Sequence, residues 1–252
     1  MPRTADEATT QPDDGSSWVA VGLPTEHGGW SLTLEPVLLG LLVEPSLAGA
    51  ALGAATLGAF LVRTPLKLAL VDRRRGRRLE RTGMATRLAT IELAVIALLG
   101  IVAVVSAEAP FWWPLVLAIP LVAAQLWFDV RSRRRRLLPE LAGSGGVAAA
   151  APALALAGGA TSSVAVGLWV IAGARAVAAI PFVRLQLRRL KAQPHRTATS
   201  DLAQVVAVAA AAAGVAFDVV PVAAAATIVV LAVVHGVLAR RAVPRAAIIG
   251  SQ

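Results

Sequence analysis

Eight long apolar blocks, separated by short loops, constrain the fold of this chain more than any other feature. A helix needs roughly 20 mostly apolar residues to cross a bilayer core of about 30 Å, and 57% of the 252 residues are hydrophobic. The blocks lack the alternation with period 2 that each strand of a membrane barrel requires. We therefore predict an all-α fold, a polytopic membrane helical bundle of about eight transmembrane helices. The predicted segments are 28–43, 47–70, 87–107, 111–128, 141–157, 163–183, 202–217 and 219–238.

Basic residues occupy every second loop. The loops around residues 44, 108, 158 and 218 contain no lysine or arginine, whereas those after the second, fourth, sixth and eighth segments are rich in arginine. Because basic loops stay in the cytoplasm, this alternation predicts a multi-pass protein of the cell membrane with both termini cytoplasmic. It also accounts for the net charge of +9. The basic runs carry few aromatic residues for base stacking, so we expect no nucleic-acid partner.

The two ends of the chain differ in composition from its middle. Residues 1–22 are polar and acidic and lack the apolar stretch of a signal peptide. We expect a disordered cytoplasmic tail there, a single transmembrane helical domain over residues 23–239, and a cytoplasmic C-terminal tail over 240–252. The absence of cysteine excludes disulfides and thiolate metal sites, and three histidines make no convincing metal site. We predict neither a metal nor a cofactor.

Several charged side chains lie inside the apolar segments or at their ends. An ionisable group in a membrane span costs about 3 kcal/mol and usually faces a cavity or a partner. The predicted topology places all of these groups in the cytoplasmic half of the bundle, which favours a polar cavity open to the cytoplasm. The candidate ligand-binding residues are Glu26, His27, Glu35, Arg63, Lys67, Glu92, Arg175 and Arg184.

Some of these residues also have a structural interpretation. The ammonium group of Lys67 can reach the membrane interface at the end of its flexible stem, and His27 can cap the first helix. Glu26 and Glu35, before and within the first segment, would be counter-charges to Arg63 and Arg175.

The opening LPTEHGGWSLTLEPVLLGLL resembles the YwiC-like family of bacterial membrane proteins. The resemblance extends through FLVRTPLKLALVDRRRGRR and FDVRSRRRRLLPELAG and covers residues 23–239. The most specific motif is Pro-x-Glu-His-Gly-x-Trp, which is formed here by Pro24, Glu26, His27, Gly28 and Trp30. Membership of this family implies a membrane topology and names no reaction.

A more distant likeness is to the UbiA-type intramembrane prenyltransferases, and it implies a UbiA-like bundle. The stretch LWFDVRSRRRRLLPELAGSGG is similar to their aromatic residue, basic cluster and Gly/Ala-rich helix. In that superfamily, two aspartate-rich motifs near the second and sixth spans hold Mg²⁺ on a substrate diphosphate. Here only Asp72 remains after the second segment, and no acid follows the sixth before Asp201. An anion would instead be held directly by basic side chains, namely Arg63, Lys67, Arg175 and Arg184.

These observations favour a cytoplasm-facing cavity that binds or processes an anionic membrane lipid or isoprenoid-like ligand. Quinone precursors, polyprenyl phosphates and phospholipids have this chemistry. One alternative is a proton-coupled transporter, with Glu35, Glu92 and His27 as relay groups between two rocking halves. Another is a non-catalytic assembly subunit of a respiratory membrane complex. The sequence identifies no catalytic residue and no protein partner.

Overall fold

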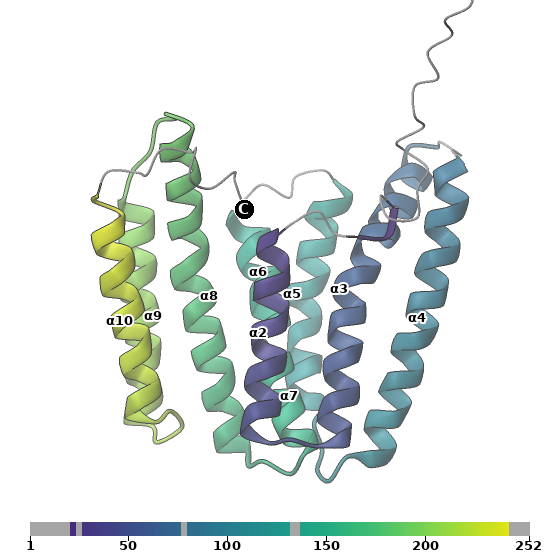
Figure 1. The fold of residues 1–252 in the computed structure, drawn as a ribbon, viewed down its shortest axis with the longest axis horizontal. Coiled ribbons are helices and arrows are strands. Elements are labelled where there is room, and N and C mark those ends of the chain that lie inside the picture. The colour runs from purple at the N-terminus through teal and green to yellow at the C-terminus, as the bar shows by residue number, and fades with distance from the viewer. Residues whose placement is uncertain (1–20, 24–26, 77–79, 132–136, 242–252) are drawn as a thin grey trace, which may run out of the picture.

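A computed structural model describes residues 21–23, 27–76, 80–131 and 137–241 of the protein, and every regular element in these ranges is an α-helix. The helices stand side by side as a bundle (Figure 1). They are α2 (His27–Val43), α3 (Leu47–Arg74), α4 (Glu80–Ser106), α5 (Trp112–Val130), α6 (Leu137–Ala148), α7 (Ala150–Ala157), α8 (Ser162–Leu190), α9 (Ala198–Ala216) and α10 (Val222–Leu238). Since α6 and α7 together form one apolar segment, Leu137–Ala157, the predicted all-α bundle of eight segments is confirmed.

Length and composition make this a multi-pass membrane protein. Five of the described segments are long and apolar enough to cross a membrane, namely Leu47–Arg74, Arg81–Ser106, Leu137–Ala157, Ser162–Leu190 and Ala198–Ala216. Three shorter apolar helices complete the bundle, at Gly29–Val43, Trp112–Phe128 and Val222–Leu238. The two predicted tails over residues 1–22 and 240–252 fall almost entirely outside the described residues.

Some helices run further than the apolar pattern predicts. α4 begins at Glu80 rather than at residue 87, and α8 ends at Leu190 rather than at residue 183. Hydropathy marks only the part of a helix that suits hydrocarbon, whereas arginine is a good helix former. The basic ends of these helices therefore stay helical beyond the apolar part of the segment.

A proline explains why the fifth segment is divided into α6 and α7. Proline lacks a backbone N–H, and its ring clashes with the carbonyl four residues earlier. For Pro152 that carbonyl belongs to Ala148, where α6 ends. α7 then begins at Ala150, after one intervening residue.

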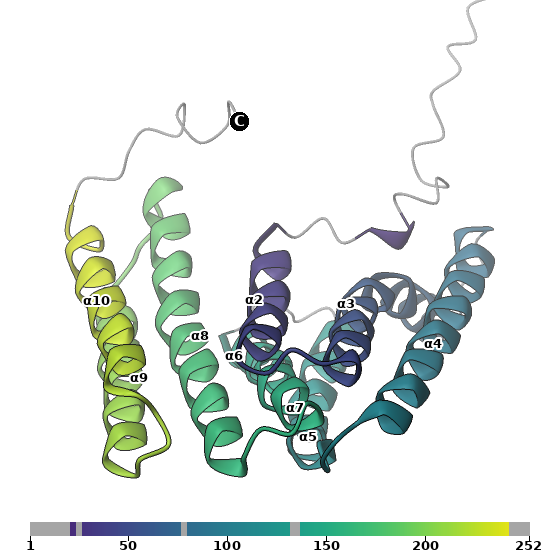
Figure 2. The same cartoon turned by 60° about the horizontal axis from the view of Figure 1, so that its bottom comes forward.

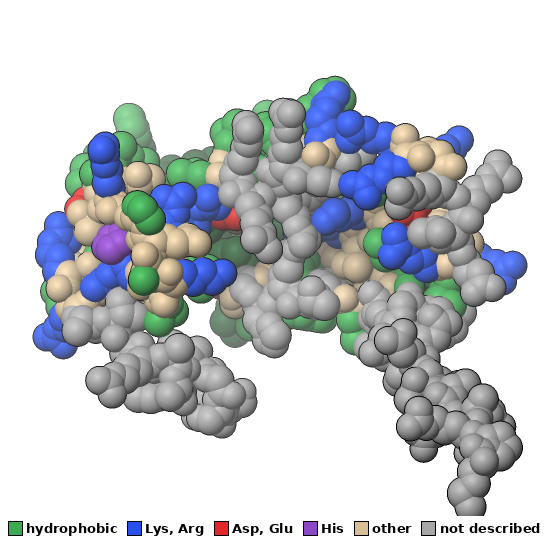
Figure 3. Space-filling model, turned by 90° about the horizontal axis from the view of Figure 1, so that it is seen from above, with side chains coloured by type: hydrophobic (Ala, Val, Ile, Leu, Met, Phe, Trp, Pro, Cys, Tyr) green, Lys and Arg blue, Asp and Glu red, His purple; other side chains and the backbone are tan. Residues whose placement is uncertain are grey.

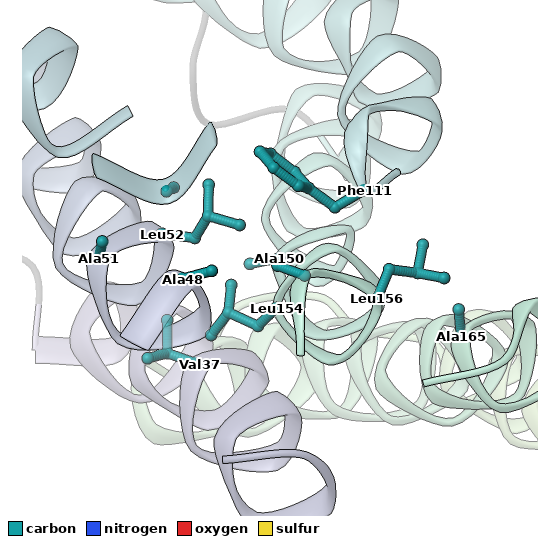
Figure 4. Packing of buried hydrophobic residues seen from close by; sticks show 11 residues of the cluster. Val37, Ala48, Ala51, Leu52, Phe111, Ala150, Leu154, Leu156 and Ala165 are labelled. Atoms are coloured by element: carbon teal, nitrogen blue, oxygen red, sulfur yellow. The ribbon is translucent and has the colours of Figure 1, made fainter. Parts of the chain in front are cut away.

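α7 is the centre of the bundle. All eight of its residues are buried, and it packs against α2, α3, α5 and α8. Leu154 of α7 lies with Val37 of α2 and Ala48 of α3 in a cluster that is rich in alanine (Figure 4). Larger apolar side chains point outward, among them Leu42 and Val105, which are 80% and 81% exposed. This arrangement suits a bilayer, where small residues let helix backbones approach and large ones meet lipid tails.

The C-terminal helices form a second packing group. α8, α9 and α10 pack around buried alanines, with Ile228 among them. These three helices lie at one end of the bundle, and α3 and α4 lie at the other (Figure 1). Figure 2 shows α2 between α8 and α3, so α2 has one neighbour from each end of the molecule.

A substitution of Gly40 tests the close approach of α2 and α7. A Cβ at Gly40 would lie 2.7 Å from the carbonyl oxygen of Ala151 and 2.8 Å from the Cβ of Leu154. Overpacking of this kind costs about 1–3 kcal/mol, so Gly40→Ala should lower the midpoint of thermal unfolding in detergent. The matched control is Gly100→Ala in α4, where a Cβ meets nothing within 4 Å and helix propensity improves by up to about 1 kcal/mol. Equal midpoints for the two variants would contradict this packing.

Candidate functional site

A pocket of about 350 Å³ lies between α2, α3, α5 and α6. Most of its wall is apolar, with Phe60, Leu66 and Leu115 among the lining residues. Its polar lining residues come from all four helices and are Thr33, Thr56, Arg63, Gln125 and Ser144. The described lining therefore combines one cation with neutral hydrogen-bonding groups and contains no carboxylate.

Helical periodicity brings the polar residues of α3 to the pocket. Thr56, Phe60 and Arg63 are separated by four and three residues, so they share one face of the helix. On α6, Gly143 faces α5, and the amide of Gln125 occupies the space where a Cβ would lie, with its atoms 2.3–2.6 Å from that position. The glycine therefore makes room for Gln125.

Arg63 and Gln125 join α3 to α5 across the pocket. When the Gln125 amide is oriented with its oxygen toward the guanidinium, that oxygen accepts hydrogen bonds from Arg63 Nη1 at 3.2 Å and Nη2 at 3.1 Å. This orientation follows from the hydrogen-bond donors around the amide. The pair places a charged group with several N–H donors at the edge of an apolar space.

The hydroxyl groups of the pocket are bonded to their own helices. Thr33 donates to the carbonyl of Gly29 at 2.9 Å, and Thr56 donates to that of Leu52 at 2.8 Å. Ser144 donates to the carbonyl of Glu140 at 2.8 Å. Each hydroxyl proton is thereby used, and donation to a bound molecule falls mainly to Arg63 and the amide of Gln125.

A second charged group lies on the other side of α2. Arg175 Nε of α8 is 2.5 Å from Glu35 Oε1 of α2, and both side chains are about one third exposed. Residues 33 and 35 are about 200° apart around a helix, given 3.6 residues per turn. Thr33 therefore faces the pocket between α2, α3, α5 and α6, referred to below as the Arg63 pocket, while Glu35 faces α8.

The remaining described candidates neither line the Arg63 pocket nor belong to the pair of Glu35 and Arg175. Arg184 Nη1 of α8 is 2.8 Å from Glu140 Oε2 of α6. Lys67 follows Arg63 by one turn of α3. Glu92 is on α4, and its Oε2 is buried without a hydrogen-bond partner among the described residues.

The predicted site residues thus fall into several groups rather than one. Arg63 lines the pocket, Glu35 and Arg175 pair between α2 and α8, and Arg184 pairs between α8 and α6. Glu26 and the side chain of His27 lie outside the described residues. The pairing of a first-segment glutamate with Arg175 is as the sequence suggested, whereas a ligand-binding role for any of these residues stays a prediction.

The sequence reasoning overlooked three neutral or weakly basic groups. Gln125 contacts Arg63, and Gln204 of α9 donates from Nε2 to the carbonyl of Ala178 in α8 at 2.8 Å. His235 Nδ1 of α10 is 3.3 Å from Gln204 Oε1, and its ring stacks on Phe182 at 4.1 Å. Gln125 and Gln204 could have been found in the sequence as isolated amides within apolar blocks, since such amides commonly form hydrogen bonds between membrane helices. A search for charges alone does not find it.

The described acidic and histidine side chains do not gather as metal ligands do. No group of three or more His, Cys, Asp or Glu residues in the described ranges could hold a metal ion. Asp72, the acid that follows the second segment, accepts a hydrogen bond from Thr82 at 2.8 Å and lies 3.5 Å from Arg81 Nη2. It is only 2% exposed and joins α3 to α4.

Comparison with known proteins identifies one family. A family model described as "YwiC-like protein" matches residues 23–155, which is 133 of the 252 residues and thus more than half of the chain. The matched range runs from the start of α2 nearly to the end of α7 and includes every residue that lines the Arg63 pocket. No curated protein and no solved structure matches the chain.

A double-mutant cycle tests the contact between α2 and α8. Glu35→Gln and Arg175→Gln should each destabilise the protein, because each leaves its partner's charge uncompensated. The double variant should lose less than the sum of the two, by about 1 kcal/mol or more, as expected for side chains in contact. Thermal unfolding in detergent measures all four proteins.

The pair between Arg240 and Asp201 serves as the control, because Arg240 is 60% exposed and exposed pairs couple by less than about 1 kcal/mol. Strictly additive losses at Glu35 and Arg175 would contradict the pairing.

Proposed function

The chain belongs to the YwiC-like family, and on that premise we propose that it binds an amphipathic ligand with an anionic head in the pocket between α2, α3, α5 and α6. A membrane lipid or an isoprenoid phosphate has this chemistry. The pocket lies wholly within the part of the chain that matches the family. The proposal concerns binding and includes no chemical step.

The lining of the pocket carries the proposal. Arg63 is the one charged residue among the described lining residues, and a guanidinium beside apolar walls attracts an anion more strongly than one in bulk water. Its planar fork of N–H donors also matches the oxygens of a phosphate or carboxylate. The apolar walls around it would hold the hydrocarbon tail. Apolar walls with a few polar groups that fix orientation are typical of small-molecule sites.

The size of the pocket limits how much of the ligand it encloses. Ligand pockets measure about 300–1,000 Å³, so about 350 Å³ is at the small end of this range. The head group and the first part of the tail would fill it. The rest of a long chain would continue between the helices into the bilayer, where apolar side chains already face outward.

A UbiA-like relationship remains part of the proposal, limited to the fold and to the class of ligand. The aspartate-rich motifs of that superfamily hold a metal on a diphosphate, whereas Asp72 here contacts Thr82 and Arg81. An acid that is already hydrogen-bonded between two helices supports a structural role. The residues therefore favour direct binding of the anion by arginine over metal-assisted ionisation.

We also propose that both termini face the cytoplasm and that residues 23–239 form one transmembrane domain. The arginine-rich ends of α3 and α8 support this orientation. In this arrangement the Arg63 pocket is nearer the cytoplasmic side, because Arg63 precedes the basic end of α3 by about three turns of helix.

Binding of farnesyl phosphate tests the role of Arg63. Arg63→Met keeps an unbranched stem and removes the charged guanidinium, so affinity for farnesyl phosphate in detergent should fall about tenfold or more, as expected when a charge-assisted hydrogen bond is lost. Farnesol has the same tail and no anionic head, and it should bind both proteins alike. Calorimetric titration measures both ligands.

The matched control for this experiment is Arg87→Met, an exposed arginine on α4 outside the pocket. It should bind farnesyl phosphate as the unchanged protein does. If the unchanged protein binds no farnesyl phosphate, or if Arg63→Met and Arg87→Met behave alike, the proposed function is wrong.

Cysteine labelling tests the orientation. The chain contains no cysteine, so single cysteines report without background. Glu108 lies in the loop after α4 and Lys191 directly follows α8, and both are exposed. A membrane-impermeant maleimide should label Glu108→Cys in intact cells, or in spheroplasts, and Lys191→Cys only after lysis. The opposite pattern would reverse the proposed orientation.

A further inference from the structure

A smaller pocket, of about 190 Å³, lies where α8 ends and α9 begins. Its polar lining consists of three arginines and two hydroxyl residues, namely Arg184, Arg188, Arg196, Thr199 and Ser200. We propose that this pocket, referred to below as the α8–α9 pocket, binds a phosphate-type anion. It shares no lining residue with the Arg63 pocket, so this proposal and the proposed function stand or fall separately.

The sequence brings the three arginines together by two routes. Pro181, Arg184 and Arg188 are three and four residues apart and share one face of α8. After α8 the chain reverses at Ala192, whose φ is 50°, and this turn returns Arg196 to the same side. α9 then starts at Ala198 and places Thr199 and Ser200 in its first turn. Figure 3 shows this face of the molecule, where lysine and arginine side chains lie over both ends of the bundle, the end formed by α8, α9 and α10 included.

The nearby carboxylates leave the α8–α9 pocket positively charged. Glu140 pairs with Arg184 at 2.8 Å. Asp201, in the first turn of α9, is bonded by Arg240 through both of its oxygens, each at 3.1 Å. Among the described residues no carboxylate forms an ion pair with Arg188 or Arg196. Like charges around one small space repel each other, and a bound anion would remove that repulsion.

The donors around the pocket suit a phosphate better than a simple halide. Guanidinium groups bind phosphate oxygens in pairs, and the hydroxyls of Thr199 and Ser200 can donate to further oxygens. The positive end of the α9 dipole adds to this attraction. Thr197, the N-cap of α9, makes no side-chain hydrogen bond to the first turn, so N–H groups there are not capped in the usual way.

Exposure allows the anion to arrive from either of two sources. Arg188, Arg196 and Thr199 are exposed, whereas Ser200 is only 2% exposed at the base of the pocket. A soluble phosphate compound could enter from water, and a lipid could present its phosphate from the bilayer surface. The volume equals that of several water molecules at about 30 Å³ each, which is enough for one phosphate group.

Titration with two phosphate probes tests the proposal. Inorganic pyrophosphate is titrated into the full chain in uncharged detergent. The salt concentration is about 0.15 M, so that attraction to surface charges is screened beyond about 8 Å. A parallel titration uses short-chain phosphatidic acid against phosphatidylcholine with the same chains. Arg188→Gln combined with Arg196→Gln should weaken binding of at least one phosphate probe tenfold or more. The unliganded unfolding midpoint should not fall, because both arginines are exposed and their removal relieves the repulsion between them.

The matched control is Arg73→Gln combined with Arg87→Gln. It removes the same charge from exposed arginines of α3 and α4, at the other end of the bundle (Figure 1), and it should leave affinity within about twofold of the unchanged protein. If the variant with Arg188→Gln and Arg196→Gln loses affinity for pyrophosphate and keeps its affinity for phosphatidic acid, the ligand is a soluble anion. Loss of phosphatidic acid binding alone identifies a lipid phosphate. No binding to the unchanged protein, or equal losses in the two double variants, would overturn the proposal.

Discussion

Close approach of helix backbones holds this protein together. In a bilayer, lipid tails are as apolar as leucine, so the hydrophobic effect gives helices little reason to associate, and packing between small residues takes its place. α7 illustrates this, because five of the eight residues of this buried helix are alanine and it packs against α2, α3, α5 and α8. The large apolar residues point outward instead. A core built from such small side chains leaves room between helices, and both pockets described above lie between helices that pack in this way.

The second organising interaction is electrostatic and depends on α2. One face of this helix contributes Thr33 to the Arg63 pocket, and the opposite face presents Glu35 to Arg175 of α8. A charge in a membrane is tolerated when a partner or a cavity accommodates it, and here one helix provides both. α2 thus separates Arg63, which lines the pocket and contacts Gln125, from Arg175, which pairs with Glu35. This separation is why the arginines, which look equivalent in the sequence, have different surroundings in the structure.

Much of the fold could be predicted from the sequence, because the bilayer imposes a simple rule on length and hydropathy. The eight segments followed from that rule, whereas the extra helical turns at Glu80 and Leu190 did not, since they lie beyond the apolar part that hydropathy detects. The site was less predictable. Whether Arg63 and Arg175 face the same space depends on the rotation of two helices about their axes, and hydropathy carries no information on rotation. Gln125 was missed because a neutral amide stands out only once Arg63 is placed beside it.

The contacts of α8 with its neighbours limit how the C-terminal helices can move within the membrane. α8 is joined to α9 and α10 by small-residue packing and by the contacts of Gln204, and to α2 and α6 by two ion pairs. Any rigid-body displacement of the last three helices would have to stretch both pairs at once. Water that penetrates the seam where α8 faces both α2 and α6 would raise the local dielectric constant and weaken both attractions together. Hydration of that single seam would therefore control how freely the C-terminal third of the bundle tilts.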